Sequence, residues 1–172
     1  MLNKALPDWR VINSGEGGMN SNWGMDNFGK KVLRYNPHVV LMEFSINDAY
    51  IRYDEIDYGC KATSLVQSIK NIKFMIKKLK WCKVFYMTMS PPLNKFLFDR
   101  NPAEDRPEYW LYSNVHQKVA YDIPGVEVID IAEKWQVLST EKFLEYCPDG
   151  LHPNECGSEN ITLPTILERL EL

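Results

Sequence analysis

The residues best suited to chemistry lie near the C-terminus, in the run Asp149-Gly150-Leu151-His152-Pro153-Asn154. A carboxylate and an imidazole at this spacing, with a glycine between them, can fold so that both side chains reach one site. Asp149 could then orient His152 through Nδ1 and leave Nε2 free to accept a proton. A lone histidine in a loop is usually just solvated, but one that shares a tight turn with an aspartate is a better candidate for a general base.

A second group of polar residues is Ser45-Ile46-Asn47-Asp48, which directly follows an apolar run. Ligands bind at the carboxyl ends of strands in open α/β sheets, so Asn47 could aim its side-chain amide at a developing oxyanion. Capping of the next helix explains Asn47 or Asp48 by itself comparably well, and both interpretations stand.

A third loop, Asn13-Ser14-Gly15-Glu16-Gly17-Gly18, is rich in glycine and also follows a predicted strand. Glycines allow left-handed backbone and let amide groups point outward at an anion. Taken alone, such a loop is more often just a tight turn. It lacks the G-x-G-x-x-G spacing of a dinucleotide site, and the acidic Glu16 argues against a nucleotide-binding protein.

Apolar periodicity predicts the elements that position these loops. Short apolar runs rich in β-branched or aromatic residues predict strands over 9–13, 39–44, 83–89 and 126–130. Helical patterns cover 23–35, 64–80, 108–121, 131–138, 140–146 and 157–170, and the proline-rich stretch 91–107 predicts a long surface loop. Continuous apolar strands that alternate with helices are typical of a mostly parallel sheet covered on both faces. We therefore expect a three-layer α/β sandwich, in a single domain over 1–172.

The helix predicted over 64–80 has the clearest apolar stripe. The stripe consists of Leu65, Ile69, Ile72, Ile76 and Leu79. Four lysines take the opposite side: Lys70, Lys73, Lys77 and Lys78. A basic face could touch a membrane or a partner, but a solvated face is the favoured interpretation in a chain of net negative charge.

Length and composition exclude several classes of function. The 172 residues suffice for one domain, and the 20 Lys+Arg against 23 Asp+Glu give a net charge of -3, so we expect no nucleic-acid partner. The apolar runs are too short to cross a bilayer, and no membrane association is expected. The histidines lack metal-ligand spacing and the cysteines form no C-x-x-C pair, so we expect no metal and no other cofactor. The scattered cysteines are Cys60, Cys82, Cys147 and Cys156. Reduced thiols make the cytoplasm the default compartment, with secretion left open.

The combination of N-S-G-E-G-G, S-I-N-D and D-G-L-H-P-N resembles blocks two, three and five of the SGNH (GDSL-type) hydrolases, in order and spacing, across nearly the whole chain. The D-x-x-H-P block is the most specific part. The resemblance implies a flavodoxin-like fold and an esterase or acylhydrolase activity. It also implies that Gly18 and Asn47 donate to the oxyanion, that His152 is the general base, and that Asp149 orients it.

Two departures from the family pattern stand out. Ser45 takes the place of the usual glycine of the third block, and the first block, Gly-Asp-Ser with the nucleophilic serine, is absent. In the family, this block is followed by a helix. Residues 2–6 of this chain resemble the last turn of that helix. We therefore expect an N-terminally incomplete domain without its first strand. The strands at Trp9 and Val39 would then either face each other across a gap or pair directly.

No other serine has the sequence context of a nucleophile. Ser14, Ser45 and Ser90 lie at predicted strand ends, but none sits in a G-x-S-x-G elbow, and Ser14 is only a weak substitute candidate. The leading hypothesis is an ester hydrolase of the acyl or carbohydrate O-acetyl type, whose nucleophilic serine lies outside this chain.

The alternative is a catalytically inactive relative that binds a ligand. The expected ligand is a small-molecule or carbohydrate ester, and Tyr109, Trp110 and Tyr112 could form a rim that stacks on sugars. The oligomeric state is left open.

Overall fold

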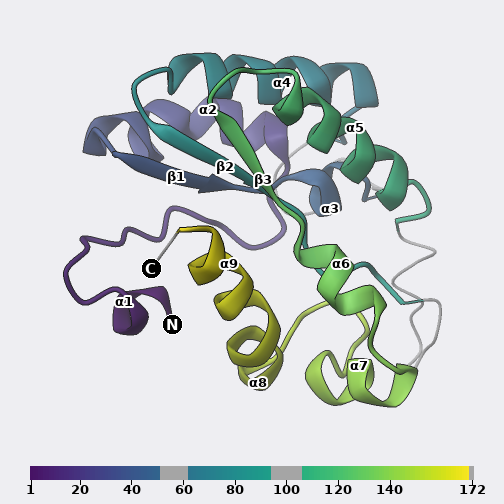
Figure 1. Cartoon of the computed structure of the whole chain (residues 1–172). Coiled ribbons are helices and arrows are strands. Elements are labelled where there is room, and N and C mark those ends of the chain that lie inside the picture. The colour runs from purple at the N-terminus through teal and green to yellow at the C-terminus, as the bar shows by residue number, and fades with distance from the viewer. Residues whose placement is uncertain (51–61, 94–105, 171–172) are drawn as a thin grey trace.

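The computed structural model describes residues 1–50, 62–93 and 106–170 (Figure 1). Its centre is an open, parallel sheet of three strands in the order β1 (Val39–Met42), β2 (Lys83–Met87) and β3 (Val126–Ile129). The register pairs Val40 with Val84, and Val84 with Val126. Parallel neighbours need crossover connections, and helices supply them here. The fold is the flavodoxin-like α/β fold that the sequence predicts, with three strands in the described part of the chain.

The strands carry apolar side chains on both faces because both faces are covered. Val84 and Tyr86 of β2 point into one apolar cluster, whereas Phe85 between them points into another. On β3, Val128 and Ile129 divide between the same two clusters. This alternation along continuous apolar runs confirms the prediction of parallel strands between two helical layers.

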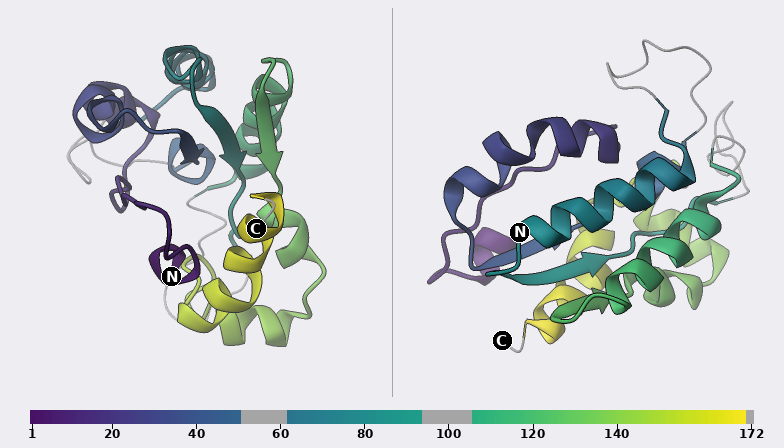
Figure 2. Two further views of the ribbon diagram at one scale, coloured as in Figure 1. Left: turned by 60° about the vertical axis from the view of Figure 1, so that its left-hand side comes forward. Right: turned by 90° about the horizontal axis from the view of Figure 1, so that it is seen from above.

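One layer consists of α2 (Ser21–Lys31), α4 (Leu65–Lys78) and α5 (Tyr109–Tyr121), which lie side by side over one face of the sheet (Figures 1 and 2). A 3₁₀ turn, Leu33–Tyr35, follows α2 and ends in Asn36, whose positive φ of 46° stops the helix. The helix predicted over 23–35 therefore begins two residues earlier and divides into these two parts.

Helix α4 confirms the stripe predicted from the sequence. The Ser64 side chain caps its first turn by accepting from the Gln67 N–H, and Ile72 and Ile76 are buried against the sheet. The lysines of the opposite side are exposed, as a solvated face requires. Within the ranges that the structure describes, no helix is long and apolar enough to cross a membrane.

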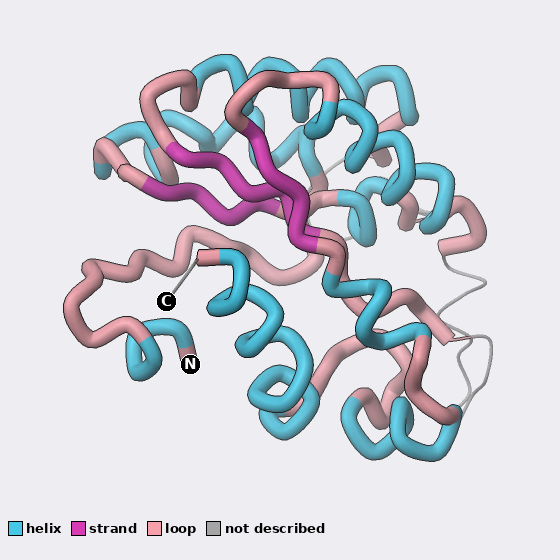
Figure 3. Tube along the Cα trace, in the orientation of Figure 1, coloured by secondary structure: helices cyan, strands magenta, loops and turns pink. Residues whose placement is uncertain are grey.

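The other layer consists of short helices (Figures 1 and 3). They are α1 (Leu2–Ala5), α6 (Ile131–Gln136), α7 (Thr140–Tyr146), α8 (Glu155–Gly157) and α9 (Leu163–Arg169), with a π-helical turn, Ser158–Thr162, before α9. Trp135 is the largest side chain of their core and packs edge-on against Phe143 and Tyr146. The single helix predicted over 157–170 is thus three consecutive segments. The predicted loop over 91–107 lies mostly outside the described residues.

The strand predicted over 9–13 is wrong: this segment is an extended loop, and Trp9 and Ile12 are 41% and 38% exposed. A strand must pair its backbone N–H and C=O groups with a neighbour. Among the described residues β1 pairs only with β2, so its other edge is unpaired, and no strand lies between it and this segment. Direct pairing of the two strands, one of the two expected arrangements, therefore does not occur.

A buried polar network fixes the short helix α3 (Ser45–Asp48), which follows β1, against the first helical layer. Asp48 Oδ1 accepts the Ser21 N–H at the start of α2, with an N···O distance of 2.7 Å, and Oδ2 accepts the hydroxyl of Ser68 in α4. Ser68 Oγ also lies 2.5 Å from Nε2 of His116 in α5. Nδ1 of His116 in turn lies 2.5 Å from the hydroxyl oxygen of Tyr86 in β2.

The donors and acceptors of this network form one directed chain. Ser68 gives its only hydroxyl proton to Asp48, so His116 must donate to Ser68 from Nε2–H. Nδ1 is then the acceptor, and the Tyr86 hydroxyl donates to it. His116 is fully buried, and burial lowers its pKa to about 3, which keeps the imidazole neutral in this chain of bonds.

Position 157 requires glycine because atoms of neighbouring residues lie too close to leave room for a Cβ atom. A Cβ atom there would lie 2.6 Å from the Tyr146 carbonyl oxygen and 2.9 Å from the Trp135 ring, whereas nothing lies within 4 Å of a Cβ at Gly29 of α2. We expect Gly157→Ala to destabilise the chain by about 1–3 kcal/mol and Gly29→Ala to stabilise it by about 0.5–1 kcal/mol. Urea unfolding of the two variants measures both values, and a stable Gly157→Ala variant would contradict the packing.

The neutral, buried His116 predicts an acid-dependent loss of stability. The ordinary histidine pKa is 6.5. Between pH 6.5 and about pH 3, His116 therefore binds a proton in the unfolded chain but not in the folded chain. Stability is therefore lost as the pH falls through this window, with a slope of about 1.4 kcal/mol per pH unit from this residue. The free energy of unfolding, measured with urea at a series of pH values, should fall less steeply towards low pH in His116→Gln than in the parent chain. Replacement of an exposed imidazole, His38→Gln, is the matched control, and equal slopes for His116→Gln and the parent chain would overturn the assignment.

Candidate active site

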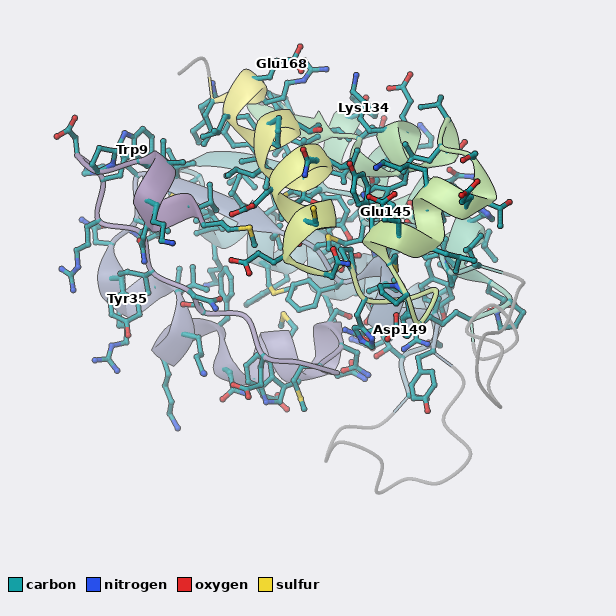
Figure 4. The ribbon with its side chains drawn as sticks, turned by 90° about the horizontal axis from the view of Figure 1, so that it is seen from below. Trp9, Tyr35, Lys134, Glu145, Asp149 and Glu168 are labelled. Carbon is teal, nitrogen blue, oxygen red and sulfur yellow. The ribbon has the colours of Figure 1, made fainter. Side chains whose placement is uncertain are left out.

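Asp149 and His152 form a tight turn on the loop between α7 and α8, where Figure 4 labels Asp149. Asp149 Oδ1 accepts the N–H groups of Leu151 at 2.9 Å and His152 at 2.7 Å. Its other oxygen, Oδ2, lies 2.6 Å from Nδ1 of His152. Gly150 has a φ of 72°, a left-handed conformation that favours glycine and lets the chain reverse between the two residues. One carboxylate thus holds both the backbone and the ring of His152.

The hydrogen bonds of this turn favour the ionised form of Asp149, and they leave one nitrogen of the His152 ring exposed to solvent. Partial burial alone would raise the pKa of Asp149, but the hydrogen bonds from His152 and Leu151 outweigh it and lower the pKa below its usual value. The His152 side chain is 76% exposed, and within the described residues its Nε2 has no hydrogen-bond partner. With Nδ1–H donated to Asp149, the lone pair of Nε2 faces solvent and can accept a proton.

The turn is held at both ends by the neighbouring helices. Asn154 donates from its side chain to the carbonyl of Glu145, and its own side-chain oxygen caps α8 by accepting from Gly157 N–H. Leu93, which follows β2, donates its N–H to the Gly150 carbonyl at 3.0 Å. The turn is therefore attached to the carboxyl end of the sheet.

Asn47 lies in α3, at the carboxyl end of β1. Its side chain is half-buried, and within the described ranges the amide has no hydrogen-bond partner. Glu43 fixes the start of α3 by accepting from Ser45 Oγ at 2.5 Å and from the Ile46 N–H at 3.1 Å. Burial raises the pKa of Glu43 to about 7, and the nearby Asp48 adds to the rise while these hydrogen bonds oppose it. An amide donor thus sits on a helix that is anchored at both ends.

Gly18 lies two residues before Asn20, the residue that caps α2 with its side chain. Its φ of 74° is a conformation that favours glycine, as the glycine-rich loop predicts. The bond from Ser21 N–H to Asp48 joins this loop to α3, so the structure brings the segments of Gly18 and Asn47 together. The hydrogen bonds of His152, by contrast, stay within its own turn. The catalytic roles of the four residues stay predictions.

The serines at strand ends have structural partners or lie buried. Ser14 donates to the Lys31 carbonyl at the C-terminal end of α2, the opposite end from the Ser21–Asp48 contact. Ser45 is buried and donates to Glu43, and the Ser90 hydroxyl is buried with no hydrogen-bond partner in the described structure. Among the described residues, none of the three hydroxyls has a hydrogen bond to a histidine. These positions do not support Ser14 as the substitute nucleophile.

Three residues near the site have no role in the sequence prediction: Glu43, His116 and Cys147. Cys147 lies 3.9 Å from Asp149 Oδ1, but burial and the adjacent carboxylate raise its pKa to about 12, so it stays a thiol and is no nucleophile. Glu43 could have been noticed as a charge at the end of an apolar strand. His116 could have been found on the buried face of its helix, at helical spacing from Tyr109 and Tyr112.

The aromatic rim expected from Tyr109, Trp110 and Tyr112 is largely core. Tyr109 and Tyr112 are buried, and their hydroxyls donate to the carbonyls of Met89 and Thr63, whereas Trp110 is 43% exposed. Residues three apart on α5 share one face, which here packs against Ile46 and Ala49, and the two residues between them are exposed. Of the three, only Trp110 has an exposed side chain, so the three do not form the expected rim.

Solved structures share this fold at low sequence identity. An acetyl xylan esterase, AlAXEase, superposes with a TM-score of 0.77 at 20% identity, with 98% of this chain and 88% of that one covered. The acetylxylan esterase Axe2 from Geobacillus stearothermophilus gives 0.72 at 18% identity, with 99% and 77% covered. A GDSL-like lipase from Bacteroides thetaiotaomicron gives 0.70 at 19% identity, with 98% and 81% covered.

Sequence comparison places the chain in a family directly. No curated protein matches it. A family model does match, that of the GDSL-like lipase/acylhydrolase family, and the match covers residues 1–159. This range includes the glycine-rich loop, the Asn47 helix and the Asp149–His152 turn that the structure attaches to the same sheet. The chain therefore belongs to the GDSL-like lipase/acylhydrolase family, a family of ester hydrolases.

Proposed function

We propose that this chain supplies the base and the oxyanion donors of an ester hydrolase with a Ser-His-Asp mechanism. The observation that carries the proposal is the Asp149–His152 pair, in which the carboxylate binds Nδ1 and Nε2 is left exposed and available. A solvated histidine needs no such partner, whereas a general base needs its tautomer and ring orientation fixed.

The mechanism takes two similar steps. A serine hydroxyl attacks the ester carbonyl carbon while His152 Nε2 takes its proton, and the Asn47 amide with the Gly18 N–H stabilises the oxyanion. The bond from carbon to the alcohol oxygen then breaks, and His152 returns the proton to the leaving alcohol. Water attacks the acyl-enzyme with the same help from His152, which releases the carboxylic acid and restores the serine.

The nucleophilic serine belongs, in this proposal, to a strand outside this chain that pairs with the unpaired edge of β1. The strand β1 is apolar throughout, Val39-Val40-Leu41-Met42, as interior parallel strands are, yet three of its four residues are only half-buried. An edge of this kind exposes both apolar surface and unpaired backbone groups. A strand placed there ends beside α3, and hence beside Asn47.

The substrate class we propose is a small-molecule or carbohydrate ester, with acyl esters and O-acetyl groups on carbohydrate as the two types. The similarity in fold to acetylxylan esterases supports the second type. Two further structures of Axe2 are catalytic mutants, one with a serine and one with a histidine replaced by alanine, which supports a serine–histidine mechanism here. The mechanism as derived requires no metal or other cofactor.

One prediction concerns the base and the oxyanion donor, in a protein extended by its upstream coding sequence. With short p-nitrophenyl esters, His152→Ala should lower kcat on the order of 10⁶-fold and Asn47→Ala by about 10²–10³-fold. Asn160→Ala, which removes an exposed amide on the π-helical turn, is the matched control and should keep full activity. Equal activity with and without His152 would sink its assignment as the base.

Another prediction separates the hydrolase from a ligand-binding relative. A fluorophosphonate probe labels an activated serine, so it should label the extended protein and leave residues 1–172 alone unlabelled. Mass spectrometry of the labelled peptide identifies the serine. Labelling at Ser14 would show that the nucleophile lies within this chain. An unlabelled extended protein that still binds esters would favour the alternative, an inactive relative.

A further inference from the structure

The outer side of α4 and the turn after it carry a dense cluster of positive charge. Residues 64–83 contain six lysines and no aspartate or glutamate, although the whole chain has a net charge of -3. All six are exposed, and only Lys83, which is paired with Glu127, has an ion pair among the described residues. The other five are Lys70, Lys73, Lys77, Lys78 and Lys80. No described acidic side chain therefore neutralises them.

Two large aromatic rings lie among these lysines. Phe74 is 45% exposed and lies one helical turn after Lys70 and one turn before Lys78, whose ammonium is 5.2 Å from the centroid of the Phe74 ring. Trp81 is 54% exposed, in the turn that joins α4 to β2. Exposed lysines alone fit a solvated face. Lysines that alternate with exposed aromatic rings are typical of a surface that meets the headgroup region of a membrane.

The layer on the far side of the sheet carries the opposite charge. Residues 131–170 contain seven acidic side chains and only three cationic ones. Figure 4 shows this side of the molecule and labels Glu145, Asp149 and Glu168 on it. Salt screens charges that lie more than about 8 Å apart, so this distant layer does not cancel the attraction of an anion to α4. The positive charge is therefore concentrated on one face of a chain whose net charge is negative.

We propose that the outer side of α4 binds the surface of an anionic lipid bilayer. In this arrangement the lysines lie near the anionic headgroups, and Phe74 and Trp81 enter the interfacial region between headgroups and acyl chains. The contact is peripheral, so it needs no membrane-spanning helix. The Asp149–His152 turn lies in the other layer, between α7 and α8, and stays uncovered.

The expectation of no membrane association was based on the net charge and on the shortness of the apolar runs. Neither quantity records on which side of the molecule the lysines lie, or which aromatic rings are left exposed beside them. The tertiary structure supplies both observations, because it buries the apolar stripe of α4 against the sheet and leaves Phe74 outside that contact. The proposal is independent of the hydrolase activity.

The test measures the binding of residues 1–172 to lipid vesicles by sedimentation. Vesicles of phosphatidylcholine with about 30% phosphatidylglycerol should bind the chain at least about tenfold more tightly than vesicles of phosphatidylcholine alone. Raising the salt concentration from about 0.05 M to about 0.5 M should weaken this binding, because salt screens the lysines. Equal affinity for the two kinds of vesicle, or no binding to either, overturns the proposal.

Paired lysine variants locate the contact on the molecule. Lys70→Gln with Lys77→Gln should lower the affinity for anionic vesicles about 25-fold, since each lysine near the surface contributes about a factor of five. Replacement of the same two lysines by arginine keeps the charge and should keep the binding. The matched control, Lys134→Gln with Lys142→Gln, removes the same charge from α6 and α7. Equal losses in the two glutamine variants would mean that only net charge matters, and would overturn the assignment to α4. Urea unfolding verifies that each variant is folded.

Tryptophan fluorescence tests whether the aromatic rings enter the bilayer. Anionic vesicles whose acyl chains carry bromine should quench the fluorescence of the parent chain, and Trp81→Phe should remove most of this quenching. Trp9→Phe is the matched control, because Trp9 is 41% exposed on the extended loop before α2, and it should keep the quenching. Phe74→Ser should lower the affinity about three- to tenfold through lost apolar contact. Quenching that is lost with Trp9 and kept without Trp81 would place another face on the bilayer and overturn the proposal.

A soluble polyanion is the competing occupant of a surface rich in lysine. Heparin and single-stranded RNA are therefore measured at the same salt concentration as the vesicles. Binding to either polyanion that is tighter than binding to the anionic vesicles, and unchanged in Phe74→Ser, would make the surface a site for polyanions and overturn the proposal. Displacement of the vesicles by inorganic phosphate at millimolar concentration would overturn it as well, since a bilayer contact depends on many headgroups at once.

Discussion

Asp48 is a buried carboxylate on which the arrangement of several elements depends. Its two oxygens accept from Ser21 at the start of α2 and from Ser68 of α4, and Ser68 connects it to His116 of α5. A buried carboxylate without such donors costs several kcal/mol, so none of these helices can shift without breaking a bond that water does not replace. Asn47 directly precedes Asp48, and the same bonds fix its backbone. The core network therefore fixes the backbone of the residue that we propose as an oxyanion donor.

The other half of the site has a different physical basis. The Asp149–His152 turn is exposed and closes on itself through hydrogen bonds within four residues. Its attachment to the fold comes from the Asn154 side chain, which donates to the Glu145 carbonyl and accepts from the Gly157 N–H, and from the Leu93 N–H, which donates to the Gly150 carbonyl. Of the two proposed parts of the site, Asn47 thus lies on a helix held by buried bonds, whereas His152 lies in an exposed turn held by local bonds. The first is held in place by the buried network, and the second leaves the His152 ring exposed to solvent.

The sheet itself shows what happens when an apolar strand lacks a neighbour. β1 has the sequence of an interior strand but lies at an edge, and the loop with Trp9 and Ile12 stays unpaired and exposed. The unpaired edge of β1 is the feature to which the proposed function assigns a partner strand.

The sequence by itself determined the features that depend on neighbours along the chain. These are the three paired strands, the stripe of α4, the positive φ of Gly18 and the contact between Asp149 and His152. Tertiary structure decided what depends on distant partners. The segment 9–13 has strand composition but no strand beside it, and a strand forms only where backbone groups can pair. The roles of Asp48 and His116 stayed hidden for the same reason: their bonds join residues from separate helices and a strand, and no local pattern records which buried polar groups will meet.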